Sequence, residues 1–138
     1  MTTTRTTGTF TFADWKESAV AGDDGGPKIA HAVVTNAFTG AIEAKDTRCV
    51  YAICYAPDGS GTGSFSGYQR CEGTVGGRAG AFVLHEWGTF DEKSTVHCSF
   101  EVLPGSATGE LAGLAGTGGY TAVPGEAAVA YTFDHTLG

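Results

Sequence analysis

The stretch 67-GYQRCEGTVGGRAGAFVLHEWGTF-90 decides the fold, because it has the pattern of two β-strands joined by a glycine turn. Apolar and polar residues alternate on both sides of the sequence Gly-Gly-Arg, as they do in strands with one buried face. Residues 64–75 and 79–90 are therefore predicted to form two neighbouring antiparallel strands.

The rest of the chain repeats this pattern of short β-rich runs separated by turns. No stretch of 12 residues shows the periodicity of an amphipathic helix, and only 109–114 is predicted to form a helical turn. An acidic glycine loop is expected at 21–27, and the strand at 47–56 is expected to be covered on both faces because it is apolar throughout. The further predicted strands are 9–16, 28–44 with a bend near Gly40, 47–56, 94–103, 118–123 and 127–135.

Eight short antiparallel strands predict either a closed barrel or a sandwich, and the glycines favour the barrel. Glycine usually weakens a strand, but a small closed barrel needs bends at such positions. We therefore expect an all-β fold, an eight-stranded antiparallel closed β-barrel, as a single domain over residues 1–138. The glycines within or beside the strands are Gly40, Gly67, Gly73, Gly80 and Gly88.

Composition and charge exclude several classes of protein. The chain has a net charge of −7 and no basic stripe, so binding to nucleic acid or to an anionic membrane surface is not expected. The N-terminal sequence MTTTRTTGTF has no apolar signal region, and the apolar runs are too short to span a bilayer, so a cytoplasmic location is expected. The four cysteines have no CxxC spacing and are interpreted as free thiols.

Motifs for metals, cofactors and nucleophilic catalysis are also missing. The four histidines form no HxH or HExxH motif, and there is no GxSxG motif. The glycine-rich segments are not followed by the helix that a phosphate cradle requires. We therefore expect neither a metal nor a cofactor.

Strand alternation places Gln69 and Glu86 on the apolar faces of their strands. Gln69 is the only strongly polar residue on its face, and Glu86 follows Phe82 and Leu84. A buried amide can orient a ligand carbonyl, and a buried carboxyl with a raised pKa can act as an acid or a base. A purely structural role, with each group bonded to a neighbouring side chain, is the alternative for both residues.

Other candidate ligand contacts are aromatic, basic or imidazole side chains. Tyr51 and Tyr55 share one strand face and are expected to present their hydroxyls to a ligand, although such aromatic pairs are also common in cores. The opposite faces of the opening hairpin carry further candidates at the barrel rim, with His85 as an alternative catalytic group and Arg70 as a carboxylate-binding group. The candidates on those faces are Tyr68, Arg70, His85 and Trp87.

Four segments resemble a bacterial domain-of-unknown-function family, number 3224. They are WKE at 15–17, GGPKIAHAVVTNAFTGAIE at 25–43, YQRCEGTVGGRAGAFVLHEWGTF at 68–90 and PGSATGELAGLAGTGGYTA at 104–122. The first segment makes Trp15 a further candidate ligand contact. Where the family pattern reads FVLQH, this chain has FVLHE at 82–86, so an imidazole replaces an amide and a glutamate follows.

The resemblance implies an eight-stranded barrel similar to plant allene oxide cyclase and to lipocalin-like barrels, but no settled activity. Barrels like allene oxide cyclase fold a hydrophobic substrate in the lumen and steer its ring closure, which is an analogy of fold.

The sequence thus predicts a barrel that binds one small apolar or amphipathic molecule in its lumen. If it is an enzyme, we expect a cofactor-independent cyclase or isomerase, with Glu86 moving a proton or stabilising charge and Gln69, Tyr51 and Tyr55 orienting the substrate. A non-catalytic carrier or sensor of a hydrophobic metabolite is the second hypothesis. The third is an oligomerisation module with a solid core, which a lumen without a cavity would favour. A homo-oligomer is compatible with all three.

Overall fold

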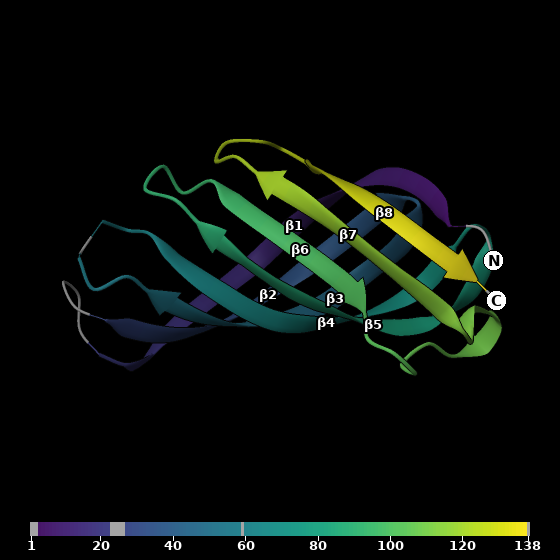
Figure 1. Cartoon of the computed structure of the whole chain (residues 1–138), viewed down its shortest axis with the longest axis horizontal. Coiled ribbons are helices and arrows are strands. Elements are labelled where there is room, and N and C mark those ends of the chain that lie inside the picture. Colours follow the sequence, from purple (N-terminus) through teal and green to yellow (C-terminus); the bar gives the residue numbers. More distant parts are fainter. Residues whose placement is uncertain (1–2, 23–26, 59, 138) are drawn as a thin grey trace.

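The chain folds into a closed barrel of eight antiparallel strands, as the computed structural model of residues 3–22, 27–58 and 60–137 shows (Figure 1). Each strand pairs with the next strand along the chain, and β1 closes the barrel against β8. The strands are β1 (Thr4–Ala21), β2 (Lys28–Gly40), β3 (Ile42–Tyr55), β4 (Gly63–Val75), β5 (Arg78–Phe90), β6 (Val96–Val102), β7 (Leu114–Ala122) and β8 (Val129–Leu137), with a 3-10 helix η1 (Gly109–Leu111) before β7.

The predicted fold class is confirmed, and so is the hairpin that led to it. Strands β4 and β5 pair without interruption from Gly63 opposite Phe90 to Val75 opposite Arg78. The chain reverses at Gly76 and Gly77, which both have positive φ angles. The helical turn is shorter than predicted, with three residues in η1. Residues 23–26 of the predicted loop at 21–27 lie outside the described part of the chain.

Two details of the strand prediction are wrong. The stretch 28–44 is not one bent strand, because β2 ends at Gly40 and β3 begins at Ile42. Gly40 has a φ of 95°, a conformation that glycine adopts easily, and the chain reverses there. Strand β3 is also not covered on both faces: Val50 is 38% exposed, because the outer face of the barrel meets solvent.

Extra residues in β1 and β3 change which side chains face the interior. The β1–β2 register shifts between Ala13 and Lys16, where Asp14 has a φ of 59°. The β2–β3 register shifts opposite Asn36 and Phe38, where Asp46 has a φ of 56°. These are β-bulges, and each reverses the alternation of inward and outward residues beyond it.

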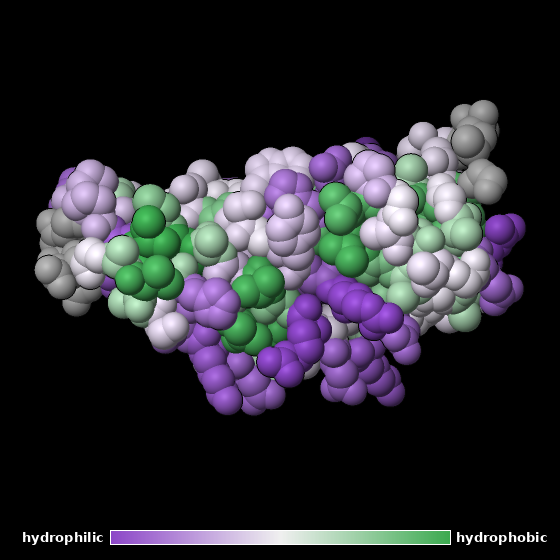
Figure 2. Space-filling view, turned by 90° about the horizontal axis from the view of Figure 1, so that it is seen from below, coloured by the Kyte–Doolittle hydropathy of each residue, from purple (hydrophilic) through white to green (hydrophobic). Residues whose placement is uncertain are grey.

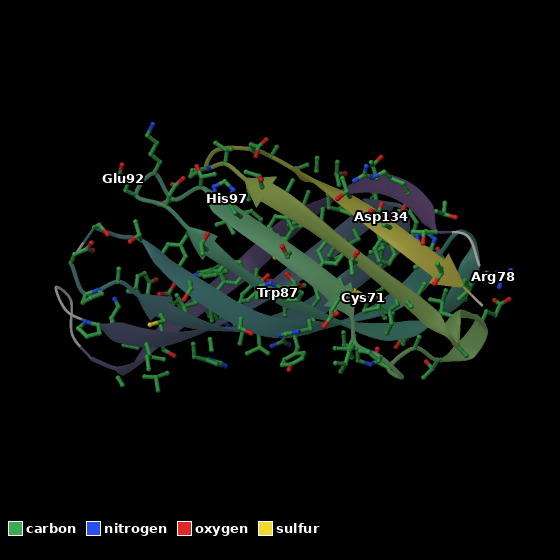
Figure 3. The ribbon with its side chains drawn as sticks, viewed as in Figure 1. Cys71, Arg78, Trp87, Glu92, His97 and Asp134 are labelled. Atoms are coloured by element: carbon green, nitrogen blue, oxygen red, sulfur yellow. The ribbon has the colours of Figure 1, made fainter. Side chains whose placement is uncertain are left out.

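The interior has a solid half and a hollow half. At the end that contains both chain termini (Figure 1), aromatic and aliphatic side chains fill the lumen and Leu111 of η1 packs against them, fully buried. The other half has a buried wall built by β2 and β3, with Ala30, Ala32 and Val34 on β2 and Tyr51 on β3. Arg78 and Glu92 are labelled in Figure 3 near opposite ends of the barrel, at the solid and the hollow end respectively.

A substitution at Gly73 tests how closely β3 and β4 approach each other. A Cβ atom at this position would lie 1.9 Å from the backbone oxygen of Glu43. We predict that Gly73→Ala lowers the free energy of unfolding by about 1–3 kcal/mol, because the neighbouring backbone must move. Urea denaturation measures the change.

Ser64→Ala is the matched control, because Ser64 lies on the exposed face of the same strand. We expect this variant to stay within about 0.5 kcal/mol of the natural protein. Equal stabilities of the two variants would contradict the close approach at Gly73.

Candidate functional site

A carboxyl group is buried at the boundary between the two halves of the barrel. Glu86 of β5 is 1% exposed and faces the lumen, as strand alternation predicts. The phenol of Tyr51 donates a hydrogen bond to Glu86 Oε1 at 3.0 Å, and Gln69 Nε2 donates one to Glu86 Oε2. A buried carboxyl group needs such partners, since leaving it unpaired would be costly.

The orientation of Gln69 is set by two further buried groups. Asn36 Nδ2 donates to Gln69 Oε1 at 3.1 Å, and Thr47 Oγ1 lies at the same distance from that oxygen. The amide oxygen of Gln69 is thereby occupied as an acceptor, so its amide nitrogen is turned toward Glu86. Thr47 faces the lumen only because of the bulge at Asp46.

Two buried thiols complete the surroundings of Glu86. Cys98 Sγ lies 3.7 Å from Glu86 Oε1, and Cys49 Sγ lies 4.0 Å from Glu86 Oε2. Burial raises the pKa of both thiols, and the nearby carboxyl group raises it further, so both stay protonated and act as weak donors. All four cysteines are free, and Cys54 is exposed.

Burial also raises the pKa of Glu86 above its ordinary 4.5. Hydrogen bonds from Gln69, Tyr51 and Cys98 favour the ionised form and partly oppose that effect. Burial raises the pKa of Tyr51 and of Tyr120 well above 10, so both phenols remain donors at neutral pH. Glu86 is therefore the acidic group of this network, and burial makes it keep its proton to higher pH than an ordinary glutamate does.

A cavity of about 390 Å³ occupies the hollow half of the barrel. Its walls are mainly aromatic and aliphatic, which is typical of sites for small apolar molecules. Residues of the β5–β6 and β7–β8 turns, including Ser94, Pro124 and Glu126, also line it, which places its mouth at the hollow end. The residues that line the inner part include Val34, Asn36, Tyr51, Ile53, Phe65 and Tyr120.

Glu86 itself does not line the cavity but is connected to it through tyrosines. The Tyr51 hydroxyl lies 3.0 Å from Glu86 Oε1 and 3.5 Å from the Tyr120 hydroxyl, and both tyrosines line the cavity. The arrangement can transmit a change in the protonation of Glu86 to a hydroxyl at the cavity wall.

At the mouth, Trp15, Glu17 and Tyr55 lie together. Trp15 Nε1 donates to Glu17 Oε1 at 3.3 Å, and the Tyr55 hydroxyl donates to Glu17 Oε2. Trp15 and Glu17 face inward because of the bulge at Asp14. The predicted ligand contacts Trp15, Tyr51 and Tyr55 thus all line the cavity.

The four candidates on the opposite hairpin faces lie on the outer wall of the barrel, so the expectation that they contact a ligand at the barrel rim is wrong. The His85 ring stacks on Tyr68 with the ring centroids 4.9 Å apart, and it lies 5.0 Å from the Trp87 ring. Arg70 forms an exposed ion pair with Glu72 at 2.9 Å. None of the four candidates lines the cavity, because strand alternation turns their side chains toward solvent. Figure 2 shows one face of the molecule, on which apolar side chains form separate patches among hydrophilic ones.

Sequence reasoning missed Asn36, Thr47 and Tyr120. Tyr120 is the only aromatic residue in β7, LAGTGGYTA, where it follows a run of small residues, and this contrast is a signal that could have been used. Asn36 is the polar residue on an inward face that also carries Val34 and Phe38, which is the same signal that identified Gln69. Thr47 has no comparable signal.

A second hollow, of about 500 Å³, lies on the outer side of β6, β7 and β8. It is larger than the cavity, but half of the residues around it are small side chains exposed on the barrel surface, such as Thr7, Ser99 and Thr132. Neither Glu86 nor Gln69 lines it. The lumen cavity is therefore the candidate site.

Within 3–22, 27–58 and 60–137, no group of three or more His, Cys, Asp or Glu side chains is placed to hold a metal ion. No helix in this part of the chain is long and apolar enough to cross a membrane. The cytoplasmic location stays a prediction.

Comparisons with known proteins agree with the resemblance seen in the sequence. Residues 6–135 match the sequence profile of a family described as protein of unknown function (DUF3224). A crystal structure of a protein with unknown function from the same family, from Shewanella oneidensis MR-1, is similar over 99% of both chains, with 25% sequence identity and a TM-score of 0.77. No curated protein matches the chain.

The raised pKa of Glu86 predicts how stability changes with pH. Because the pKa of Glu86 is higher in the folded state than in the unfolded state, protonation of Glu86 stabilises the fold. This stabilisation is fully present below the ordinary pKa of 4.5 and is lost as the pH rises through the folded-state pKa. Glu86→Gln does not titrate, so we expect its stability relative to the natural protein to improve with rising pH, by up to about 1.4 kcal/mol per pH unit inside that window.

Urea denaturation of both proteins at several pH values between 4 and 8 measures this difference. The value at the lowest pH is the internal control, because Glu86 is then mostly protonated in both the folded and the unfolded state. A stability difference that stays constant over the whole series would contradict the raised pKa.

Proposed function

The chain belongs to the DUF3224 family, whose function is unknown, and we propose from its geometry that the barrel binds one small apolar or amphipathic molecule and rearranges it without a cofactor. The proposed reaction is a cyclisation or an isomerisation. Such reactions need a shaped cavity, exclusion of water and one or two polar groups. We propose a cytoplasmic location for this activity.

The observation that carries the proposal is the hydrogen-bonded chain from Glu86 through Tyr51 to the cavity. It joins a buried carboxyl group with a raised pKa to a phenol that lines an aromatic cavity of about 390 Å³. Perturbed carboxyl groups beside a cavity are frequent at active sites. A cavity of this size also does not favour the solid-cored oligomerisation module.

In the proposed reaction, the Tyr120 hydroxyl donates a hydrogen bond to an oxygen atom of the substrate, because the single proton of the Tyr51 hydroxyl is already donated to Glu86. This bond stabilises negative charge that develops there as the electrons of a double bond shift. Glu86 accepts the hydrogen bond of Tyr51, so its carboxylate can take the phenol proton while the phenolic oxygen removes a proton from the substrate. The reverse relay returns a proton to another atom of the substrate, and both residues end as they began. Gln69 holds the Glu86 carboxyl group in place and is a positioning residue.

A second candidate function is a carrier or sensor that leaves its ligand unchanged. One observation favours it: Glu86 does not line the cavity, and the tyrosines separate its carboxyl group from any ligand. The two candidates share the cavity and differ only in turnover.

The shared cavity is tested by filling it. Val34 is buried and lines the cavity, so we predict that Val34→Phe weakens the binding of decanol, a neutral apolar probe, by about tenfold or more. Isothermal titration calorimetry measures the affinity, and thermal unfolding checks that the variant folds. If Val34→Phe does not fold, Ala122→Phe is the replacement variant, because Ala122 of β7 also lines the cavity.

Val50→Phe is the matched control, because Val50 lies on the outer face of β3 and does not line the cavity. We expect it to bind decanol like the natural protein. Unchanged decanol binding by a folded cavity-filling variant, or no binding by the natural protein, would contradict the proposed site.

Turnover is tested by comparing what the natural protein and Glu86→Gln retain when each is expressed in the natural host. An isomerase or cyclase of this kind conserves mass, so we predict that the two proteins retain isomers with equal mass and different chromatographic retention. Native mass spectrometry followed by chromatography of the released ligand distinguishes them. The same molecule in both proteins would contradict catalysis by Glu86 and favour the carrier.

A further inference from the structure

The charged residues that line the cavity are all acidic. Among the twenty described residues of its lining, Glu17 and Glu126 carry charge, and none is lysine, arginine or histidine. The chain as a whole has a net charge of −7. An anionic ligand such as a fatty carboxylate would therefore meet repulsion at this site, whereas a cation would be attracted.

Both carboxylates are held in place at the mouth. Glu17 accepts hydrogen bonds from Trp15 Nε1 and from the Tyr55 hydroxyl. Glu126 Oε1 accepts a hydrogen bond of 2.9 Å from the backbone N–H of Val123, within the turn that follows β7. Because their positions are fixed, these carboxylates are already arranged to meet a charged group at the mouth.

The cavity walls also favour a cation. Eight of its twenty lining residues are aromatic, and the faces of aromatic rings attract cations. The molecule already contains one such contact at the mouth, where Lys28 Nζ lies 4.6 Å from the centroid of the Tyr55 ring. Lys28 itself does not line the cavity. The eight aromatic lining residues are Phe10, Phe12, Trp15, Tyr51, Tyr55, Phe65, Phe90 and Tyr120.

We propose that the ligand class of this site is a lipophilic cation, an amine or a quaternary ammonium attached to an apolar chain or ring. Its cationic group lies at the mouth, near Glu17 and Glu126 and against the aromatic rings. Its apolar body extends inward toward Tyr51. This inference rests on the proposed function, in which the cavity holds one small molecule, and adds the charge of that molecule.

The experiment uses three probes that share one chain and differ in the charge of the head group: decyltrimethylammonium, decanol and decanoate, each below its micelle concentration. The chain has two tryptophans, Trp15 in the cavity lining and Trp87 on the outer wall. In the variant Trp87→Phe, the fluorescence of Trp15 alone therefore reports binding. We expect decyltrimethylammonium to bind about tenfold or more tightly than decanoate, with decanol between them.

The carboxylates at the mouth are tested in the same background. In the double variant Glu17→Gln and Glu126→Gln, we expect the preference for the ammonium over decanoate to fall to about threefold or less. The decanol affinity of the same variant is the reference that separates the effect of charge from any change in the shape of the mouth. The matched control is Glu72→Gln with Glu101→Gln, which makes the same change in net charge on the outer wall. It is expected to retain the preference.

Four outcomes would overturn the inference. If decanol binds but decanoate binds as tightly as the ammonium or more tightly, the inference fails and the proposed function stands. If the outer-wall control loses the preference as fully as the mouth variant, or if the mouth variant keeps it, the mouth carboxylates do not select the ligand. If none of the three probes binds, the proposed function fails together with the inference.

Discussion

The buried carboxyl group of Glu86 is the constraint on which the interior of this barrel depends. A carboxyl group that is removed from water needs hydrogen-bond partners, and here they come from several strands. Gln69 is fixed in turn by residues of β2 and β3. The network therefore ties together the inward faces of five neighbouring strands, β2 to β6, and its Tyr51 hydroxyl lies 3.5 Å from that of Tyr120 in β7.

The position of this network between two unlike halves of the lumen gives it a functional meaning. On one side, the core is filled, partly because glycines in β7 leave room for large rings: Phe100 packs where a Cβ atom of Gly118 would lie, and Phe133 does so at Gly116. On the other side, the rings stand around an open volume. The solid half holds the strands in register, and the polar network forms the inner boundary of a cavity whose walls are otherwise apolar.

The sequence predicted the fold and the inward placement of Gln69 and Glu86, because the period of two in β4 and β5 is unbroken by bulges. It did not predict that Trp15 and Glu17 turn inward, because this depends on one extra residue at Asp14. A single inserted residue leaves no mark in the pattern, although aspartate tolerates the positive φ angle that the bulge needs. The same holds for Thr47 after Asp46. Strand alternation also placed the outer-wall candidates on the faces opposite Gln69 and Glu86, but their expected position at the rim rested on residue type alone, which says nothing about contact with the cavity. The depth of the cavity depends on how aromatic rings from distant strands pack against one another. The alternation of residues along a single strand does not predict that packing.

The central claim is that Glu86 keeps its proton to higher pH than an ordinary glutamate and is linked to the cavity through Tyr51. The most direct measurement is a pH titration of the Glu86 side-chain carboxyl carbon by ¹³C NMR, assigned by comparison with Glu86→Gln, with and without decanol. The account predicts a midpoint above 4.5 and a resonance that moves when decanol fills the cavity. A midpoint at or below 4.5, or a resonance that does not respond to a probe shown to bind, would contradict it.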